Sequence, residues 1–247
     1  MPSPASVGPI LVVGASGTIG SAVARMLGAD GHIVGLHYCK NRDVIDVLSR
    51  ELQQAGAQTI VLGSSLGSID DCVDLVSRFA SQVGNFYGLA ICSGRVPWKH
   101  WQHTDRPDWT DAYFEHCVAP FALARAAADK FLPGGRLVYL SSISSKYGGS
   151  DRTLHYAAAK AGLEAAMRGL SRELARQDIR VNGVRAGFAD TPQQRAGRTP
   201  EELAARVRRI PLRRAGAPTE IASAFAYLFS EGAAFITGEI ITVAGGD

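Results

Sequence analysis

Length, composition and charge narrow the class of protein before any motif is considered. The chain has 247 residues, 46% of them hydrophobic, which fits one globular domain with a sizeable core. A formal net charge of +3 is too small to predict nucleic-acid binding, and the apolar runs are too short for a membrane span.

Short apolar segments alternate with helix-length amphipathic segments along most of the chain. The predicted strands are Ile10–Val13, Ile33–His37, Thr59–Leu62, Leu89–Cys92, Arg136–Leu140, Ile179–Val184 and Ile240–Val243. The predicted helices lie near residues 19–29, 43–55, 69–83, 108–131, 154–177 and 218–230. This alternation predicts the α/β class: a doubly wound parallel sheet of the Rossmann type, with about seven strands and helices on both faces. We expect one domain over residues 1–247, with 1–9 as a flexible tail.

The cysteines and the N-terminal residues bear on the compartment and on metal binding. Cys39, Cys72, Cys92 and Cys117 show no metal-ligand spacing, so we expect free thiols in the core and no metal site. The N-terminal segment has neither the basic nor the apolar region of a secretory signal. The expected location is therefore the cytoplasm, where thiols stay reduced.

Directly after the first predicted strand comes a glycine-rich turn, Gly14-Ala15-Ser16-Gly17-Thr18-Ile19-Gly20, which opens a helix. Glycines allow a tight turn and a close approach of the backbone to a pyrophosphate, and the helix N-terminus favours an anion there. An ordinary strand–turn–helix connection is the alternative. Its place in a β-α-β pattern favours dinucleotide binding.

The end of the second predicted strand indicates which dinucleotide binds. NAD sites usually place an acidic residue there to hold the ribose 2′-hydroxyl. This strand instead continues as Tyr38-Cys39-Lys40-Asn41-Arg42, and Lys40 and Arg42 suit a 2′-phosphate. The segment therefore favours NADPH over NADH, with a solvated basic loop as the alternative.

Three residues between positions 142 and 160 fit proton transfer to a carbonyl. Tyr156 and Lys160 are four residues apart on a predicted helix and share a face. A neighbouring ammonium favours the phenolate, so we expect Lys160 to lower the pKa of Tyr156. Ser142 ends the fifth strand and is placed to hydrogen bond the reacting oxygen.

With these motifs the chain resembles the short-chain dehydrogenase/reductase family, most of all its 3-oxoacyl-carrier-protein reductases. The matching segments are Leu140-Ser141-Ser142, Tyr156-Ala-Ala-Ala-Lys160, Arg180-Val181-Asn182, Gly187-Phe188 through Thr191, Ile236-Thr237-Gly238 and Gly245-Gly246. The resemblance implies that Tyr156 is the acid/base, that Lys160 orients the nicotinamide ribose and tunes Tyr156, and that Ser142 positions the substrate oxygen. It further implies a cofactor site made of Gly14, Ser16, Gly17, Thr18, Ile19, Gly20, Tyr38, Lys40, Arg42, Ser93, Gly94, Gly187 and Thr191.

The chain departs from the family pattern at several positions. Thr18 stands where the family has a second glycine, and Ser65 replaces an adenine-contacting aspartate. Ile91-Cys92-Ser93-Gly94 replaces Asn-Asn-Ala-Gly. His116 aligns with the asparagine of a proton relay, where it could pass a proton or serve as a packed helix residue.

The resemblance implies an NADPH-dependent reductase that transfers a hydride to a ketone, of the 3-oxoacyl type. The expected substrate is a small-molecule ketone or an acyl thioester, free or attached to a carrier protein, with no nucleic-acid or membrane partner. An alcohol or sugar dehydrogenase and a non-catalytic cofactor-binding protein are the alternatives. The resemblance also implies a homotetramer formed through the helices near 108–131 and 154–177, whose alanine-rich faces suit close helix packing or packing on the chain's own sheet.

Two long connections, residues 93–107 and 185–214, follow the fourth and sixth strands. Ligands bind outside the carboxyl ends of parallel strands, so both are candidate substrate loops, with 185–214 as a lid. Residues 195–214 hold seven arginines against two glutamates. They predict attraction of an anionic or carrier-bound substrate, with a merely solvated helix as the alternative.

Overall fold

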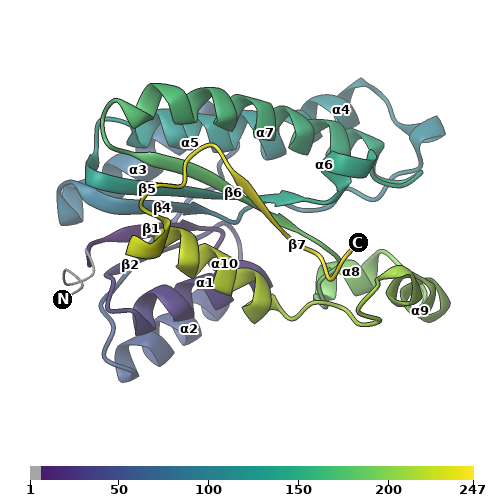
Figure 1. The fold of residues 1–247 in the computed structure, drawn as a ribbon, viewed down its shortest axis with the longest axis horizontal. Helices are drawn as coiled ribbons and strands as arrows, with labels where there is room; N and C mark the ends of the chain where they lie inside the picture. The colour runs from purple at the N-terminus through teal and green to yellow at the C-terminus, as the bar shows by residue number, and fades with distance from the viewer. Residues whose placement is uncertain (1–6) are drawn as a thin grey trace.

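A seven-stranded parallel sheet in the order β3-β2-β1-β4-β5-β6-β7 runs through the middle of the computed structural model (Figure 1). The structure describes residues 7–247. The strands are β1 (Ile10–Val13), β2 (Val34–Tyr38), β3 (Thr59–Gly63), β4 (Phe86–Ile91), β5 (Phe131–Ser142), β6 (Arg180–Ala186) and β7 (Ile240–Val243). The strand order reverses between β1 and β4, which is where such sheets bind dinucleotides. The predicted doubly wound fold is confirmed.

Helices cover both faces of the sheet (Figure 1). On one face lie α1 (Thr18–Ala29), α2 (Arg42–Gln54) and α10 (Pro218–Phe229), and on the other lie α3 (Ile69–Val83), α5 (Ala119–Ala127) and α7 (Leu154–Ala175). Each face has its own hydrophobic core. Side chains alternate along β1, so Ile10 and Val12 enter one core while Leu11 and Val13 enter the other. A strand buried on both sides must be apolar throughout, as β1 is.

The prediction of one continuous helix near 108–131 is wrong, because the helix is interrupted and it ends before residue 131. The chain forms α4 (Arg106–Tyr113), a π-helical turn (Phe114–Val118) and then α5, which ends at Ala127. Phe131 already belongs to β5, because it pairs with Phe86 of β4 and the two rings pack 5.3 Å apart. The π-helical turn buries His116 and Cys117, and such turns occur often at functional sites.

The loops at the carboxyl edge of the sheet contain further short helices. These are a 3-10 turn (Trp101–His103), α6 (Ser144–Tyr147), α8 (Pro192–Ala196) and α9 (Pro200–Arg209). Another 3-10 turn, Glu231–Ala233, lies at the amino edge, between α10 and β7. The segment with α8 and α9 extends beyond the sheet at the right of Figure 1. It is the predicted lid segment 185–214, whose first residues still belong to β6.

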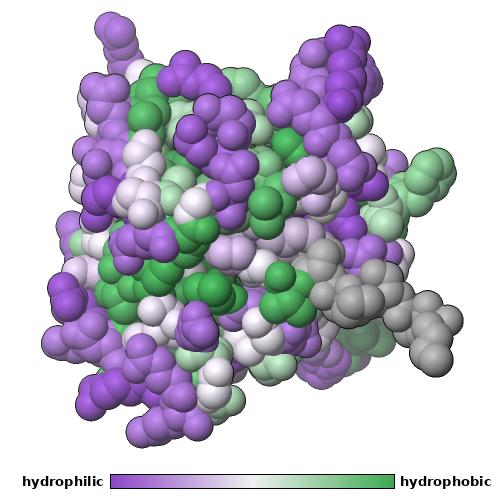
Figure 2. All heavy atoms as spheres, turned by 90° about the vertical axis from the view of Figure 1, so that its left-hand side faces the viewer, coloured by the Kyte–Doolittle hydropathy of each residue, from purple (hydrophilic) through white to green (hydrophobic). Residues whose placement is uncertain are grey.

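The opposite side of the molecule, the left-hand side of Figure 1, faces the viewer in Figure 2. There hydrophobic residues form a broken band across the middle of the face, bordered by hydrophilic ones. Most of the expected tail, residues 1–6, lies outside the described residues. Gly8 and Pro9 are held in place, because Gly8 N–H donates to His32 and Tyr87 N–H donates to the Pro9 carbonyl.

None of the described helices is both long enough and apolar enough to cross a membrane. The thiols are free in the structure, but they do not all lie in the core as expected. Cys72 and Cys117 are buried, whereas Cys39 is exposed at the end of β2.

Candidate active site

The glycine turn between β1 and α1 has no room for side chains at its two ends. Gly14 has a φ of +83°, and a Cβ there would lie 2.8 Å from the Ser93 backbone nitrogen. A Cβ on Gly20 would collide with the Gly14 carbonyl oxygen. Glycine at both positions therefore lets β1, the loop after β4 and α1 approach each other closely.

The N-terminus of α1 has the features of an anion site. Its N-cap is Gly17, which supplies no side-chain cap, and no acidic residue occupies the first turn. The first backbone N–H groups of α1 have no partner within the helix, and the helix dipole adds positive potential. Thr18 is exposed, while Ser16 and Ile19 are half-buried beside the turn. These residues fit the pyrophosphate of a dinucleotide.

His37 supports the same turn and was missed from the sequence. Its Nδ1 accepts a hydrogen bond of 3.0 Å from the Gly14 N–H, and its Nε2–H donates to the Ser64 carbonyl at 3.1 Å. Burial lowers the pKa of His37 to about 4, so the ring stays neutral and Nδ1 remains an acceptor near pH 7. A polar residue inside an apolar strand was the signal that could have revealed it.

The residues predicted to read the adenosine ribose lie at the end of β2. The Arg42 guanidinium donates to the Tyr38 hydroxyl at 3.3 Å and to Asp46 at 3.2 Å. Lys40 is exposed. Tyr38 thus stands at the end of β2, where an NAD site carries a carboxylate, and the cations Lys40 and Arg42 follow it, with Arg42 paired to Asp46.

Ser142, Tyr156 and Lys160 come together where β5 ends and α7 begins. Ser142 donates a hydrogen bond to the Tyr156 oxygen. Lys160 donates to the Leu140 carbonyl at 2.8 Å, and its Nζ lies 6.0 Å from the centre of the Tyr156 ring. The Leu140 contact holds the lysine beside the strand that ends in Ser142.

Burial dominates the electrostatics of this trio. It raises the pKa of Tyr156 to about 12, although the hydrogen bond from Ser142 acts in the opposite direction. Burial also lowers the pKa of Lys160 to about 8. The expected lowering of the Tyr156 pKa is therefore wrong for this structure, because loss of hydration outweighs the hydrogen bond with Ser142. Tyr156 keeps its proton at neutral pH.

His116 lies directly against Tyr156. The two rings are perpendicular with their centres 4.8 Å apart, and His116 Nε2–H donates to the Arg95 carbonyl at 2.7 Å. With the proton on Nε2, Nδ1 is a buried acceptor that has no partner among the described residues. Burial, then the charge of Lys160, lower the pKa of His116 to about 3.

Gly94 connects this histidine to the glycine turn. It has a φ of +124°, and a Cβ there would lie 2.6 Å from His116 Nδ1. Ser93, its neighbour, faces Gly14. The loop after β4 thus contacts both halves of the predicted site.

Gly187 and Thr191 lie after β6. A Cβ on Gly187 would lie 2.6 Å from the Cα of Ala244, so β6 and the segment after β7 are in close contact there. The buried Thr191 side chain caps α8 by accepting from the Gln194 N–H at 3.3 Å. Gly187 directly follows Ala186, the β6 partner of Ser142, so the segment that contains Gly187 and Thr191 begins beside the end of β5.

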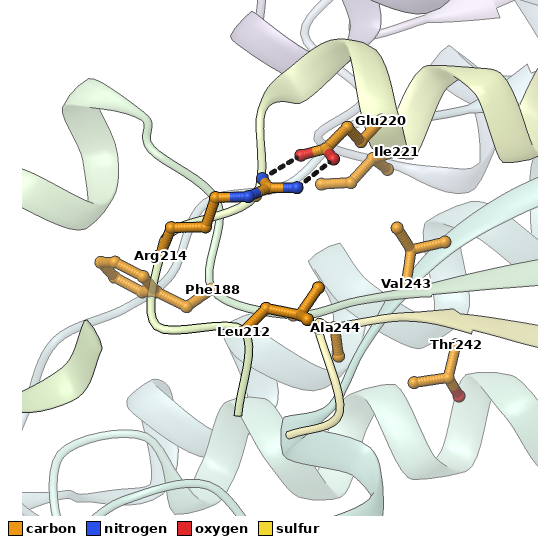
Figure 3. Close-up of a pocket in the computed structure, with 11 residues that line it drawn as sticks. Phe188, Leu212, Arg214, Glu220, Ile221, Thr242, Val243 and Ala244 are labelled. Atoms are coloured by element: carbon orange, nitrogen blue, oxygen red, sulfur yellow. Dashed lines mark hydrogen bonds and ion pairs between the residues drawn. The ribbon is translucent and has the colours of Figure 1, made fainter. Parts of the chain in front are cut away.

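A cavity of about 240 Å³ opens beside Gly187, between the ends of β6 and β7 and the start of α10 (Figure 3). Leu212, Val243 and Ala244 form apolar parts of its wall. Arg214 and Glu220 make two hydrogen bonds of 2.6 Å at its rim. Its arginine is therefore already neutralised by a carboxylate.

A buried carboxylate braces the strand end behind Ser142, and sequence reasoning missed it. Glu164 of α7 accepts from Arg185 at 2.6 Å and from the hydroxyls of Ser141 and Ser145 at 2.6 Å each. Its side chain is 5% exposed. The residues on either side of the Ser142 segment are thus fixed to α7 and β6.

Most arginines predicted to make the lid basic already have partners. Ion pairs join Arg195 to Asp190, Arg206 to Asp247 and Arg214 to Glu220. Arg213 donates to the Arg208 carbonyl, and the exposed side chains of Arg208 and Arg209 have no partner among the described residues. The free positive charge of the lid is smaller than its composition predicts.

Known proteins with this fold and site share one family. Residues 14–247 match the family model described as enoyl-(acyl carrier protein) reductase. The uncharacterized oxidoreductase YmfI of Bacillus subtilis is 33% identical over 96% of this chain and 97% of its own length. The 3-oxoacyl-[acyl-carrier-protein] reductase FabG of Staphylococcus aureus is 28% identical over 96% of each chain.

Solved structures agree with this family. A short-chain dehydrogenase/reductase from Brucella melitensis, also named a glucose/ribitol dehydrogenase, has a TM-score of 0.89 at 30% identity, over 96% of this chain and 95% of its own. The angucycline C-6 ketoreductase LanV with bound NADP has a TM-score of 0.90 at 25% identity, over 96% of this chain and 94% of its own. The chain belongs to the short-chain dehydrogenase/reductase family of oxidoreductases.

Proposed function

We propose that the chain is an NADPH-dependent reductase that converts a ketone of the 3-oxoacyl type to an alcohol, with Tyr156 as proton donor. The observation that carries the proposal is the meeting of Ser142, Tyr156 and Lys160 where β5 ends and α7 begins, with Lys160 held by its 2.8 Å hydrogen bond to the Leu140 carbonyl. Tyr156 can give a proton to a carbonyl and, in the reverse reaction, take one from an alcohol. The relatives named as a 3-oxoacyl-carrier-protein reductase and a ketoreductase favour the reductase over the alcohol or sugar dehydrogenase.

Bound NADPH would supply the hydride for the carbonyl carbon. The α1 N-terminus with Gly14 and Gly20 would hold the cofactor phosphates, and Gly94, Gly187 and Thr191 would line the path toward the nicotinamide. Ser142 hydrogen bonds the carbonyl oxygen, and Tyr156 gives that oxygen its proton. Lys160 orients the ribose and, with a pKa near 8, replaces the proton on Tyr156.

The relatives support the substrate class. One curated relative is a 3-oxoacyl-carrier-protein reductase, and one structural neighbour is a ketoreductase with bound NADP. The substrate is accordingly a ketone or an acyl thioester, free or carrier-bound. The retained serine, tyrosine and lysine argue against a non-catalytic binding protein, and the free thiols suit the cytoplasm.

For the cofactor, we expect kcat/KM to be at least tenfold higher with NADPH than with NADH. Tenfold corresponds to about 1.4 kcal/mol, a modest value for contacts between a phosphate and a cation. Lys40→Ala should remove most of this preference by weakening NADPH alone. Lys130→Ala, at the amino edge of β5, is the matched control. Equal use of both cofactors by the wild type would contradict the assignment.

His116 stays neutral and acts through its polar atoms, with Nε2–H donating to the Arg95 carbonyl and Nδ1 available as an acceptor beside Tyr156. We expect His116→Leu to lower kcat by about tenfold or more, because Nδ1 and the Arg95 hydrogen bond are lost, whereas His116→Asn keeps most activity. With a pKa near 3, His116 does not titrate around neutrality, so the pH–rate profile should keep its shape in both variants. Wild-type rates in both variants, or a profile that flattens near neutrality, would contradict this role.

We also propose a homotetramer. Trp109 and Tyr113 of α4 are 43% and 48% exposed, Phe121 of α5 is 38% exposed, and a surface hollow of about 380 Å³ lies between α4 and the π-helical turn. Exposed aromatic residues gathered on one helical face suit contact with a second copy. Light scattering should give four chain masses, and Phe121→Glu should lower that number. A wild-type monomer would contradict the proposal.

A further inference from the structure

Three loops at the carboxyl edge of the sheet meet at Trp98. The loop after β4 carries Trp98, and a Cβ on Gly197 of the lid would collide with the indole ring. Backbone hydrogen bonds from Lys99 to Arg152 (3.1 Å) and from Trp101 to Asp151 (2.8 Å) tie the same loop to the segment before α7. That segment leads directly to Tyr156. Trp98 therefore lies at the junction of the loop after β4, the lid and the segment that leads to Tyr156.

Arg198 of the lid stacks on this tryptophan. Its guanidinium carbon lies 4.5 Å from the centre of the Trp98 ring and 5.3 Å from that of Phe188, which follows Gly187. The side chain is half-buried between the loop after β4 and the segment after β6. Both rings hold the planar guanidinium in a fixed orientation by cation–π contact.

Arg198 is half-buried, unlike the exposed Arg208 and Arg209, and it has no carboxylate partner among the described residues. Its polar contacts are the side chain and the carbonyl of Gln194. Neighbouring Arg152 pairs with Glu202 at 3.2 Å, and Arg206 pairs with Asp247. Burial, followed by the charges of Arg206 and Arg152, lowers the pKa of Arg198. Arg198 is thus a half-buried cation close to two other positive charges. A bound anion would offset the repulsion among them, so this position favours an anion.

The indole of Trp98 points to the same ligand independently. Its Nε1–H is buried and has no acceptor among the described residues. A buried donor without a partner is uncommon, because it has lost its hydrogen bond to water. The stacked pair thus offers two kinds of hydrogen-bond donor and no acceptor.

We propose that Arg198, with the Trp98 indole N–H, binds an anionic group carried by the substrate itself. This inference rests on the proposed function and narrows its substrate to ketones that bear a carboxylate or a phosphate. A guanidinium binds either anion with two parallel hydrogen bonds. Recognition of the anion then occurs at Arg198, where the lid meets Trp98, rather than on the exposed arginines at the end of α9.

The test uses one keto group in four forms: acetoacetate, methyl acetoacetate, acetoacetyl-coenzyme A and acetoacetyl-N-acetylcysteamine. R198M keeps an unbranched apolar side chain at this position and removes the guanidinium with its charge. We expect R198M to lower kcat/KM by about 30-fold or more, mainly through KM, for acetoacetate or for acetoacetyl-coenzyme A. For the matching uncharged compound, the methyl ester or the N-acetylcysteamine thioester, we expect a loss of less than about twofold. A loss confined to acetoacetate identifies a carboxylate ligand, and one confined to the coenzyme A thioester identifies a phosphate.

Two further variants keep the outcome specific. W98F keeps an aromatic ring for Arg198 to stack on and removes the indole N–H, and it should lower kcat/KM for the anionic substrate by about fivefold. R195M, an exposed lid arginine paired with Asp190, should change neither form and is the matched control. Equal losses in R198M for charged and uncharged forms would overturn the proposal, since Arg198 would then only latch the lid onto Trp98. No loss for any form would also overturn it. Failure of the proposed function itself is distinguishable, because the wild type would then reduce none of the four compounds.

Discussion

Replacing Tyr156 by phenylalanine should lower kcat by about 10²-fold or more and leave the affinity for NADPH nearly unchanged. The substitution removes one oxygen, the atom that accepts the hydrogen bond from Ser142 and holds the proton. The aromatic ring remains, so its perpendicular contact with His116 is kept. The cofactor contacts at the α1 N-terminus do not involve this oxygen. Steady-state rates and a fluorescence titration with NADPH measure the two quantities.

The matched control for that variant is Tyr147→Phe. Tyr147 lies at the end of α6, close in sequence to Ser142, but its side chain is 56% exposed. It should keep wild-type rates. A Tyr156→Phe enzyme with near-normal kcat would exclude Tyr156 as the proton donor, and one that no longer binds NADPH would point to a structural defect instead.

Glu164→Ala should cost about 3–5 kcal/mol of unfolding free energy, the largest stability effect expected from one side chain here. The carboxylate and its partner Arg185 are 5% and 17% exposed. Its removal leaves the guanidinium of Arg185 and the hydroxyls of Ser141 and Ser145 without their acceptor. Denaturant unfolding measures the change. Glu173→Ala, an exposed carboxylate on the same helix, should have little effect.

The contribution of Glu164 should also depend on pH. Burial alone would raise its pKa, but hydrogen bonds from Arg185, Ser141 and Ser145 outweigh burial and hold the pKa below its ordinary value. A carboxylate with a depressed pKa stabilises the fold above its unfolded pKa, and the stabilisation is lost as the pH falls through the folded value. The wild type should therefore lose its advantage over Glu164→Ala in acid. A constant difference at every pH would contradict the buried charge pair.

The fold was predictable because its signals are local and repeated. β1 is apolar at every position. The turn after it has glycine at the two positions that need one: position 14 adopts a positive φ, and a side chain at position 20 would collide with the Gly14 carbonyl. The helix near 108–131 was not predictable in detail, because helical periodicity does not distinguish a π-helical turn from a regular one. That turn matters, since it buries His116 beside Tyr156.

The members of the site were predictable, whereas their electrostatics and supports were not. Spacing on a helix places Tyr156 near Lys160, but the balance between burial and the hydrogen bond with Ser142 requires the packed structure. Glu164 and Arg185 are far apart in sequence and meet only because α7 crosses β6. The sequence shows how many arginines the lid contains but not what each one contacts. It could not show that Arg195 pairs with Asp190 whereas Arg198 stacks on Trp98.

The most direct test of the central claim follows NADPH oxidation by the purified wild-type chain with methyl acetoacetate and acetoacetyl thioesters, and measures the alcohol formed. Ketone reduction consumes one hydride and one proton for each alcohol produced. We expect ketone-dependent oxidation of NADPH with one alcohol formed per NADPH consumed. Tight NADPH binding without ketone-dependent oxidation for any of these substrates would contradict it.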